Sequence, residues 1–285
     1  MERLRTVLAD RGALLASSAV LVMLFAAVLA PIIAPQNPYD LAQLNLLDAG
    51  VPPISRSMDG QLFLLGSDEQ GRDIFSAILY GLRISLSVAA VATLFAASLG
   101  VSIGLLSAYV GGYADAALMR LVDMQLSFPA VLIALMLVAA LGSGIDKVVL
   151  AIVGVQWAYY ARTARSAALV EREREYVEAA RCLAYNPLRI MFVHILPNCL
   201  APLTILASVE VAAAIMIEAT LSFLGVGLPL TQPSLGLLIA NGYPFMLAGK
   251  YWLTVFPGFV LIVLVVSINV LGERMREVFD PRVDA

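Results

Sequence analysis

Long runs without a charged residue are the feature that most constrains how this chain can fold. A helix needs about 20 mostly apolar residues to cross a hydrocarbon core of about 30 Å, and ionisable side chains are costly at its centre. Uncharged runs of that length occupy residues 12–39, 84–114, 124–145 and 251–272. Two weaker runs, 148–161 and 198–217, are counted as further spans, although the first is short and Glu210 interrupts the second. The pattern predicts an all-α integral membrane protein with about six transmembrane helices in a lipid bilayer.

The composition supports this class and excludes several others. Apolar residues make up 61% of the chain and charged residues 14%, whereas soluble domains carry about 25% charged residues. The net charge of −3 implies no nucleic-acid partner. One histidine, His194, and two widely spaced cysteines, Cys182 and Cys199, predict no metal site and no cofactor in this chain. We expect no catalytic residues, because the motifs H-E-x-x-H and G-x-S-x-G of intramembrane or other hydrolases are absent.

The basic residues predict the orientation in the membrane. With a cytoplasmic N-terminus, 13 of the 18 Lys and Arg residues fall in inside segments and 5 in outside segments. Cytoplasmic loops carry an excess of these residues, so we expect both termini on the cytoplasmic side. The first uncharged run is too long for the apolar region of a signal peptide and is interpreted as a retained anchor.

The first outside segment, residues 35–80, is polar and rich in proline and glycine. We expect a loop-rich cap, grouped with the first helix as residues 1–80, ahead of a core of five helices over residues 81–285. The stretch 66–73 combines turn residues with helix N-cap candidates. It is either a turn and cap at the membrane surface or a contact with an external partner. The contact residues would be Asp68, Arg72 and Asp73.

The longest inside segment, residues 163–197, is predicted to form two short helices joined by a turn. The first runs from Glu171 to Ala184 and has separate apolar and charged faces. The apolar face holds Tyr176, Val177, Ala180, Leu183 and Ala184, and the charged face holds Arg174, Glu178 and Arg181. Asn186-Pro187 starts the second helix, which is expected to end before Pro197. The pair is either a solvated connector or a docking surface for another protein.

Two acidic residues, Glu210 and Glu218, lie eight positions apart in the fifth predicted span and therefore share a helix face. Ionisable residues inside a membrane are candidates for function. Glu210 either lines a translocation cavity or makes a structural hydrogen bond. Glu218, nearer the outer end, is either exposed to water or caps the backbone of the loop that follows it.

Four motifs resemble one family of membrane proteins. Glu178-Ala179-Ala180, followed by His194-Ile195-Leu196-Pro197-Asn198, resembles the EAA signature of permease subunits of binding-protein-dependent ABC importers. More narrowly, the chain resembles the C-type subunit of the dipeptide, oligopeptide and nickel branch. Residues 66–73, 221–227 and 280–282 are similar to that branch's GTDxxGRD, LSFLGLG and LDPR elements, in the same order. The resemblance covers residues 60–282.

The resemblance implies a fold, a function and partners. The fold would be that of a type I ABC importer permease with a cytoplasmic coupling helix, in a bacterial or archaeal cytoplasmic or inner membrane. The chain would form half of the translocation pathway for peptides or a related small solute. Its partners would be a homologous second permease, two ABC ATPase subunits and an external substrate-binding protein. The chain contains no G-x-x-x-x-G-K-[ST] motif, so partner subunits would hydrolyse ATP.

The resemblance also assigns the coupling residues. They would be Tyr176, Glu178, Ala179, Ala180, Leu183 and Ala184, with Glu178 meeting a base on the ATPase. The family has glycine where this chain has Ala184. If that position has a positive φ, alanine costs about 1 kcal/mol; alternatively, Tyr185-Asn186 carries the turn.

The alternative function is a stand-alone secondary transporter or channel. Many secondary transporters contain internal repeats, and the sequence shows no clear one.

Overall fold

The computed structural model describes residues 11–40, 44–58, 60–229 and 231–279, and almost all regular structure among them is helical. The N-terminal part and the cap that follows it contain α2 (Arg11–Val28), α3 (Ala30–Ile33), η2 (Leu46–Asp48), β1 (Ser55–Arg56) and β2 (Leu62–Phe63). The bundle continues with α4 (Ile74–Val110), α5 (Gly112–Leu126), α6 (Ala130–Leu141) and α7 (Ile145–Glu171). Next come α8 (Glu175–Cys182), α9 (Pro187–Arg189), the π-helical η3 (Ile190–Ile195) and α10 (Leu196–Phe223). The last elements are α11 (Leu235–Gly242), η4 (Tyr243–Phe245) and α12 (Trp252–Phe279). Because α4 begins at Ile74, the boundary expected between residues 80 and 81 falls inside a helix.

Four helices in the described part of the chain are long and apolar enough to cross a membrane: α2, α4, the continuous helix Pro187–Phe223 and α12. α5 and α6 pass the same test together, but they are bent by 93° at the break between them. The break ends at Pro129, which lacks an N–H and disfavours helical geometry in the residue before it. The span expected over residues 124–145 is therefore not one continuous helix, and the described residues contain four helices able to span a membrane, or five spans if the bent pair counts as one.

α7 accounts for the rest of the difference from the expected six. Its 27 residues could extend about 40 Å, but its C-terminal half carries polar and charged residues. Gln156 is fully buried, Arg162 pairs with Asp123 of α5, and Arg165 pairs with Asp115 of α5. Neighbouring helices thus satisfy polar groups that lipid could not.

α4 and α7 pack closely along the centre of the bundle. A side chain added at Gly100 or Gly104 would collide with the α7 backbone near Trp157 and Ala161. Ala96 and Ala108 of the same stripe are also buried. The small residues therefore set the distance between the two helices, as a four-residue spacing of small residues predicts.

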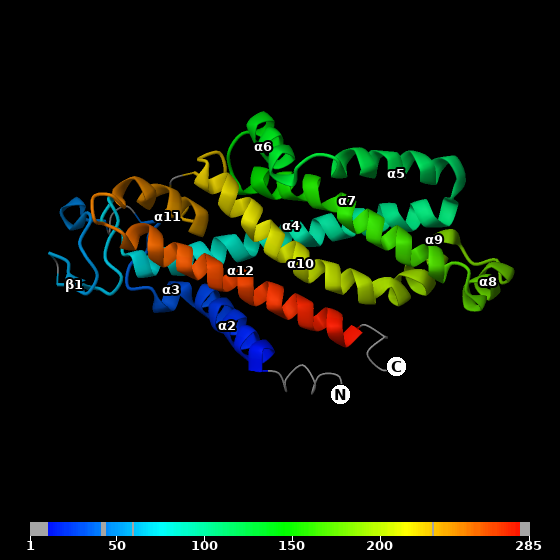
Figure 1. The fold of residues 1–285 in the computed structure, drawn as a ribbon, viewed down its shortest axis with the longest axis horizontal. Helices are drawn as coiled ribbons and strands as arrows, with labels where there is room; N and C mark the ends of the chain where they lie inside the picture. The colour runs from blue at the N-terminus through cyan, green and yellow to red at the C-terminus, as the bar shows by residue number, and fades with distance from the viewer. Residues whose placement is uncertain (1–10, 41–43, 59, 230, 280–285) are drawn as a thin grey trace.

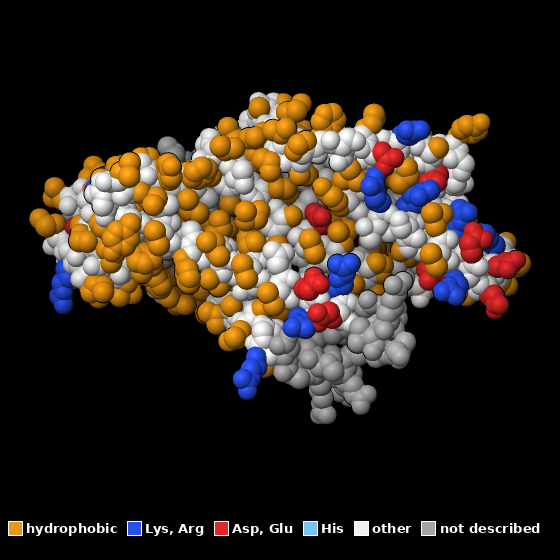
Figure 2. Space-filling view, viewed as in Figure 1, with side chains coloured by type: hydrophobic (Ala, Val, Ile, Leu, Met, Phe, Trp, Pro, Cys, Tyr) orange, Lys and Arg blue, Asp and Glu red, His pale blue; other side chains and the backbone are white. Residues whose placement is uncertain are grey.

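The elements are arranged so that the two ends of the bundle differ (Figure 1). The β1–β2 hairpin and α11 lie at one end, and α8 and α9 lie at the other (Figure 1). α2 packs against α12, and the first turn of α2 and the last turn of α12 both lie toward the α8 end (Figure 1). Figure 2 shows charged side chains gathered at the α8 end and beside these helix ends, while hydrophobic side chains cover most of the remaining visible face. This distribution is typical of a protein whose middle lies in lipid.

Candidate functional site

α8 ends in a turn centred on Ala184, whose φ is +54°. Tyr185 N–H donates to the carbonyl of Ala180 (3.2 Å), and Ala184 N–H donates to that of Arg181 (2.9 Å). This pair of bonds is a Schellman motif, which requires a left-handed residue after the helix and usually has glycine there. Ala184 therefore carries the turn itself, and the alternative at Tyr185-Asn186 is wrong.

The two faces of α8 have different environments. Val177 and Ala180 are 0% and 3% exposed because they pack against residues of the long helices α4, α7 and α10. Glu178 and Ala179 are exposed, and Leu183 is 66% exposed. Among the described residues, the Glu178 carboxylate has no ion-pair partner.

Of the residues expected to couple to a partner, those on the exposed face of α8 are therefore the ones that a partner could contact. Ala180, which was expected among the contact residues, instead lies on the buried face of α8, where it packs against this chain's own core. Ala184 remains exposed at the turn.

Tyr176 lies at the edge of this exposed face and is 38% exposed. Its hydroxyl donates to Glu171 Oε2 at 2.7 Å and accepts from Asn198 Nδ2 at 3.1 Å. Partial burial and the hydrogen bond to the Glu171 carboxylate raise the pKa of Tyr176 to about 12. The phenol therefore stays protonated, and remains a donor, throughout the physiological pH range.

The expected second helix, Leu188 to Ile195, does not end before Pro197. The chain is helical from Pro187 to Phe223, with Asn186 Oδ1 accepting from Leu188 N–H at its start (2.9 Å). A π-helical segment, Ile190–Ile195, ends two residues before Pro197. The wider π-helical turn accommodates a proline ring that would clash with a carbonyl in a regular α-helix.

Glu218 is fully buried at the junction of three helices, so it is neither exposed to water nor lining a cavity. Ser85 Oγ of α4 donates to its Oε2 (2.7 Å), and Ser222 Oγ of α10 donates to its Oε1 (2.8 Å). Ser234, the N-cap residue of α11, is a third hydrogen-bond partner. One carboxylate thus links α4, α10 and α11.

Glu210 is 6% exposed and faces α7. Gln156 Nε2 donates to the Glu210 backbone carbonyl at 2.7 Å, while Gln156 Oε1 has no partner among the described residues. The hydroxyl of Tyr160, one turn further along α7, is also buried and has no hydrogen-bond partner in the described part of the chain. This environment favours the structural interpretation of Glu210 over cavity lining.

The external stretch 66–73 forms a turn and cap. Asp68, Arg72 and Asp73 are 8%, 2% and 1% exposed, so they do not present an outer contact surface. Asp73 Oδ2 accepts from both the N–H (2.8 Å) and the hydroxyl (2.6 Å) of Ser76, which caps α4. Burial is the main cause that raises the pKa of Asp73 above its usual value. The interpretation as an external contact through these three residues is therefore wrong.

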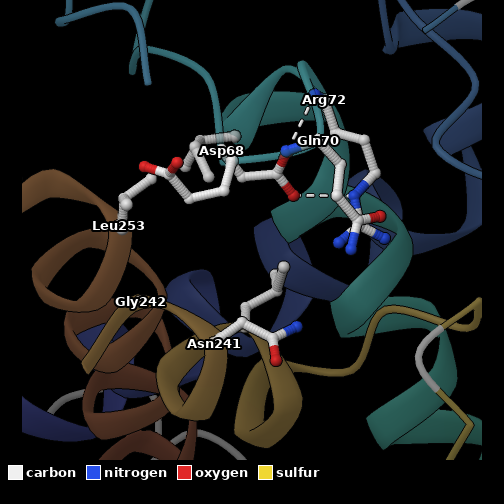
Figure 3. A pocket seen from close by; sticks show the side chains of 9 residues that line it. Asp68, Gln70, Arg72, Asn241, Gly242 and Leu253 are labelled. Carbon is white, nitrogen blue, oxygen red and sulfur yellow. Dashed lines mark hydrogen bonds and ion pairs between the residues drawn. The ribbon is translucent and has the colours of Figure 1, made fainter. Parts of the chain in front are cut away.

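Asp68 and Arg72 form a buried ion pair, with Arg72 Nε 2.7 Å from Asp68 Oδ2. Figure 3 shows them on one side of a small pocket, with Asn241 and Gly242 of α11 and Leu253 of α12 on the opposite side. The pair therefore fixes the conformation of the turn beside the pocket that α11 and α12 help to line.

Sequence reasoning missed several polar residues that complete these clusters. Ser85 and Gln156 lie inside apolar runs, and their polarity was a signal that each would need a partner in the bundle. Asn198 stands next to the motif proline, but nothing in the spacing indicates that it reaches back to Tyr176. No group of three or more His, Cys, Asp or Glu that could hold a metal occurs in the part of the chain that the structure describes.

The bundle of spanning helices, the cap at one end and the exposed helix at the other define a helical membrane permease. The family described as binding-protein-dependent transport system inner membrane component matches residues 100–285. The chain belongs to this family, and the family expected from the sequence motifs is confirmed.

Several relatives match nearly the whole chain. The dipeptide transport system permease protein DppC of Haemophilus influenzae is 37% identical over 96% of this chain and 91% of its own length. The di/tripeptide transport system permease protein DppC of Pseudomonas aeruginosa is 35% identical over 96% of this chain and 89% of its own length. The DppC protein of Escherichia coli K12 is 37% identical over 96% and 90% of the two chains.

A solved structure, an inward-facing conformation of the MetNI methionine ABC transporter, shares the fold. It has a TM-score of 0.56, is 19% identical, and is matched over 71% of this chain and 96% of the other. The expected type I ABC importer permease fold is thereby confirmed.

Proposed function

We propose that this chain is one of two permease subunits of an ABC importer that carries peptides or a closely related small solute. The observation that carries the substrate class is the 35–37% identity to dipeptide and di/tripeptide permeases over 96% of the chain. The exposed face of α8 supports a coupling role, because it offers an unpaired carboxylate beside small and apolar residues. The remaining partners are a homologous second permease, two ABC ATPases that hydrolyse ATP, and an external substrate-binding protein.

The proposal places α8 and both chain termini in the cytoplasm. The first turn of α2 and the last turn of α12 lie toward the α8 end, where basic residues are abundant (Figures 1 and 2). Cys182 is exposed on α8, whereas Cys199 is buried, so Cys182 is a natural probe of sidedness. A membrane-impermeant thiol reagent should label it only after permeabilisation, and Met58→Cys in a Cys182→Ser background should be labelled in intact cells. The reverse pattern would overturn the orientation.

Transport tests the function itself. Vesicles that contain this chain, its partner permease and both ATPases should take up a dipeptide only with ATP and the binding protein present. A stand-alone secondary transporter or channel would instead move solute in vesicles that contain this chain alone, and that result would contradict the proposal.

A further inference from the structure

α8 has only eight residues, and an isolated helix of that length is not stable in water. A short element of this kind transmits force only through its attachments to the rest of the fold. The attachments of α8 therefore decide how a push from a partner reaches the membrane helices.

One phenol joins α8 to two long helices. Glu171 is the last residue of α7, and Asn198 is the third residue of α10. The Tyr176 hydroxyl donates to the first (2.7 Å) and accepts from the second (3.1 Å). We call this pair of hydrogen bonds the Tyr176 link. Asn198 is itself held in place, because its Nδ2 also donates to the carbonyl of His194 at 2.8 Å.

The chemistry of the link requires a hydroxyl. A phenol can donate one hydrogen bond and accept others, so a single tyrosine can serve a carboxylate and an amide at once. The bond to Glu171 is charge-assisted and is therefore the stronger of the two. Phenylalanine keeps the ring and its packing but forms neither bond.

Two further contacts attach the same region to the inner end of α4. The Arg181 guanidinium lies 5.6 Å from the centre of the Tyr109 ring. Arg172 Nη1 donates to the carbonyl of Ala108 at 2.5 Å. The Arg181 contact holds α8 against the third long helix, and the Arg172 bond holds the end of α7 there. Neither contact joins α7 to α10.

From this geometry we infer that the Tyr176 link is the connection through which displacement of α8 moves α7 and α10 together. Tyr176 is thus a positioning residue rather than only an apolar contact for a partner. The inference rests on the proposed coupling role of α8. It predicts that breaking the link leaves partner binding intact and loosens the connection between ATP hydrolysis and transport.

The test uses the full transporter with its ATPases and binding protein in vesicles. Tyr176→Phe should retain ATPase subunits at the wild-type level but lower the peptide taken up per ATP hydrolysed by about fivefold or more, because the loss of even one of the two hydrogen bonds shifts an equilibrium by about that factor. Tyr185→Phe is the matched control, because the Tyr185 hydroxyl has no hydrogen-bond partner among the described residues and its ring contacts with Arg189 and His194 persist in phenylalanine.

A second pair of variants separates coupling from folding. Glu171→Gln keeps an acceptor for the phenol and should retain most of the coupling, whereas Glu171→Leu should lose it. A merely structural role would lower protein abundance and ATPase retention together with transport. Unchanged uptake per ATP in Tyr176→Phe would overturn the inference while leaving the proposed function intact; failure of the unmutated chain to bind ATPases would overturn the proposed function itself.

Discussion

Ser85 of α4 donates a hydrogen bond to the carboxylate of Glu218, 133 residues later in α10, at 2.7 Å. Ser222 and Ser234 complete the set of donors, so the acid joins α4, α10 and α11 where the bundle meets the cap. A buried carboxylate surrounded by hydroxyl donors stabilises this junction only while all of its partners are present.

Replacing this acid tests that junction. Glu218→Leu leaves the serine hydroxyls without their acceptor and should lower the free energy of unfolding by about 1–3 kcal/mol. Glu218→Gln keeps one acceptor oxygen and should have a smaller effect. Thermal unfolding in detergent measures both, with Thr220→Val, at a half-buried position of the same helix outside this hydrogen-bond cluster, as the control. Equal midpoints for Glu218→Leu and the unmutated protein would contradict the role.

We expect Glu210 to stabilise the packing of the helices rather than to line a translocation cavity. Because Gln156 bonds to its backbone and the acid is buried, Glu210→Gln should assemble normally and transport neutral and cationic peptides in the unmutated ratio. Glu210→Leu should assemble poorly, because it removes the side-chain hydrogen bond between Glu210 and the buried Gln156. A Gln variant that assembles fully but fails selectively on cationic peptides would restore the cavity interpretation.

Ala184 is under backbone strain. Its φ of +54° costs an alanine about 1 kcal/mol, so Ala184→Gly should raise the free energy of unfolding by up to about that amount, less the added entropy of the unfolded chain. The same substitution at Ala179, inside α8, should lower stability by about 0.5–1 kcal/mol. Stability is compared by thermal unfolding of both variants; a destabilised Ala184→Gly would show that the turn is not strained.

Asp73 should make stability depend on pH. Burial raises the pKa of the Asp73 carboxyl in the folded protein above its value in the unfolded chain. The contribution of Asp73 to the free energy of unfolding is therefore fully present below the pKa of the unfolded chain, and it is lost as pH rises through the higher pKa of the folded protein. Asp73→Asn has no such titration and still caps α4. Its unfolding temperature relative to the unmutated protein should therefore be higher at pH 7 than at pH 4. Asp73→Ala also lacks this titration and in addition removes the cap, so it should be about 1 kcal/mol less stable than Asp73→Asn at either pH; a pH-independent difference between Asp73→Asn and the unmutated protein would contradict the argument.

The sequence predicted the features that repeat along the chain. Uncharged runs located the main spans, and the stripe that contains Gly100 and Gly104 identified the packed face of α4, because both signals follow from helix geometry and lipid. The position of the family glycine identified Ala184 as a residue under strain.

What the sequence could not provide was contact between distant segments. Pro129 breaks a run that composition alone makes continuous, while the helix passes through Pro197 because a π-helical segment precedes it. Asp68 and Arg72 are polar enough to suggest an external surface, yet they pair with each other and are buried. Tyr176 and Asn198 are 22 residues apart, and only the folded chain brings them together.

The central claim is that the exposed face of α8 is where partner ATPases bind, with Glu178 meeting a base. Retention of the ATPase subunits on the tagged, detergent-solubilised permease measures it most directly. Glu178→Arg should lower retention by about tenfold or more, because like charges across an interface cost several kcal/mol. The control, Asp146→Arg, places the same charge at an acid that is 70% exposed at the start of α7, and should retain the ATPases normally. Wild-type retention by Glu178→Arg, with both variants inserted in the membrane in equal amounts, would contradict the account.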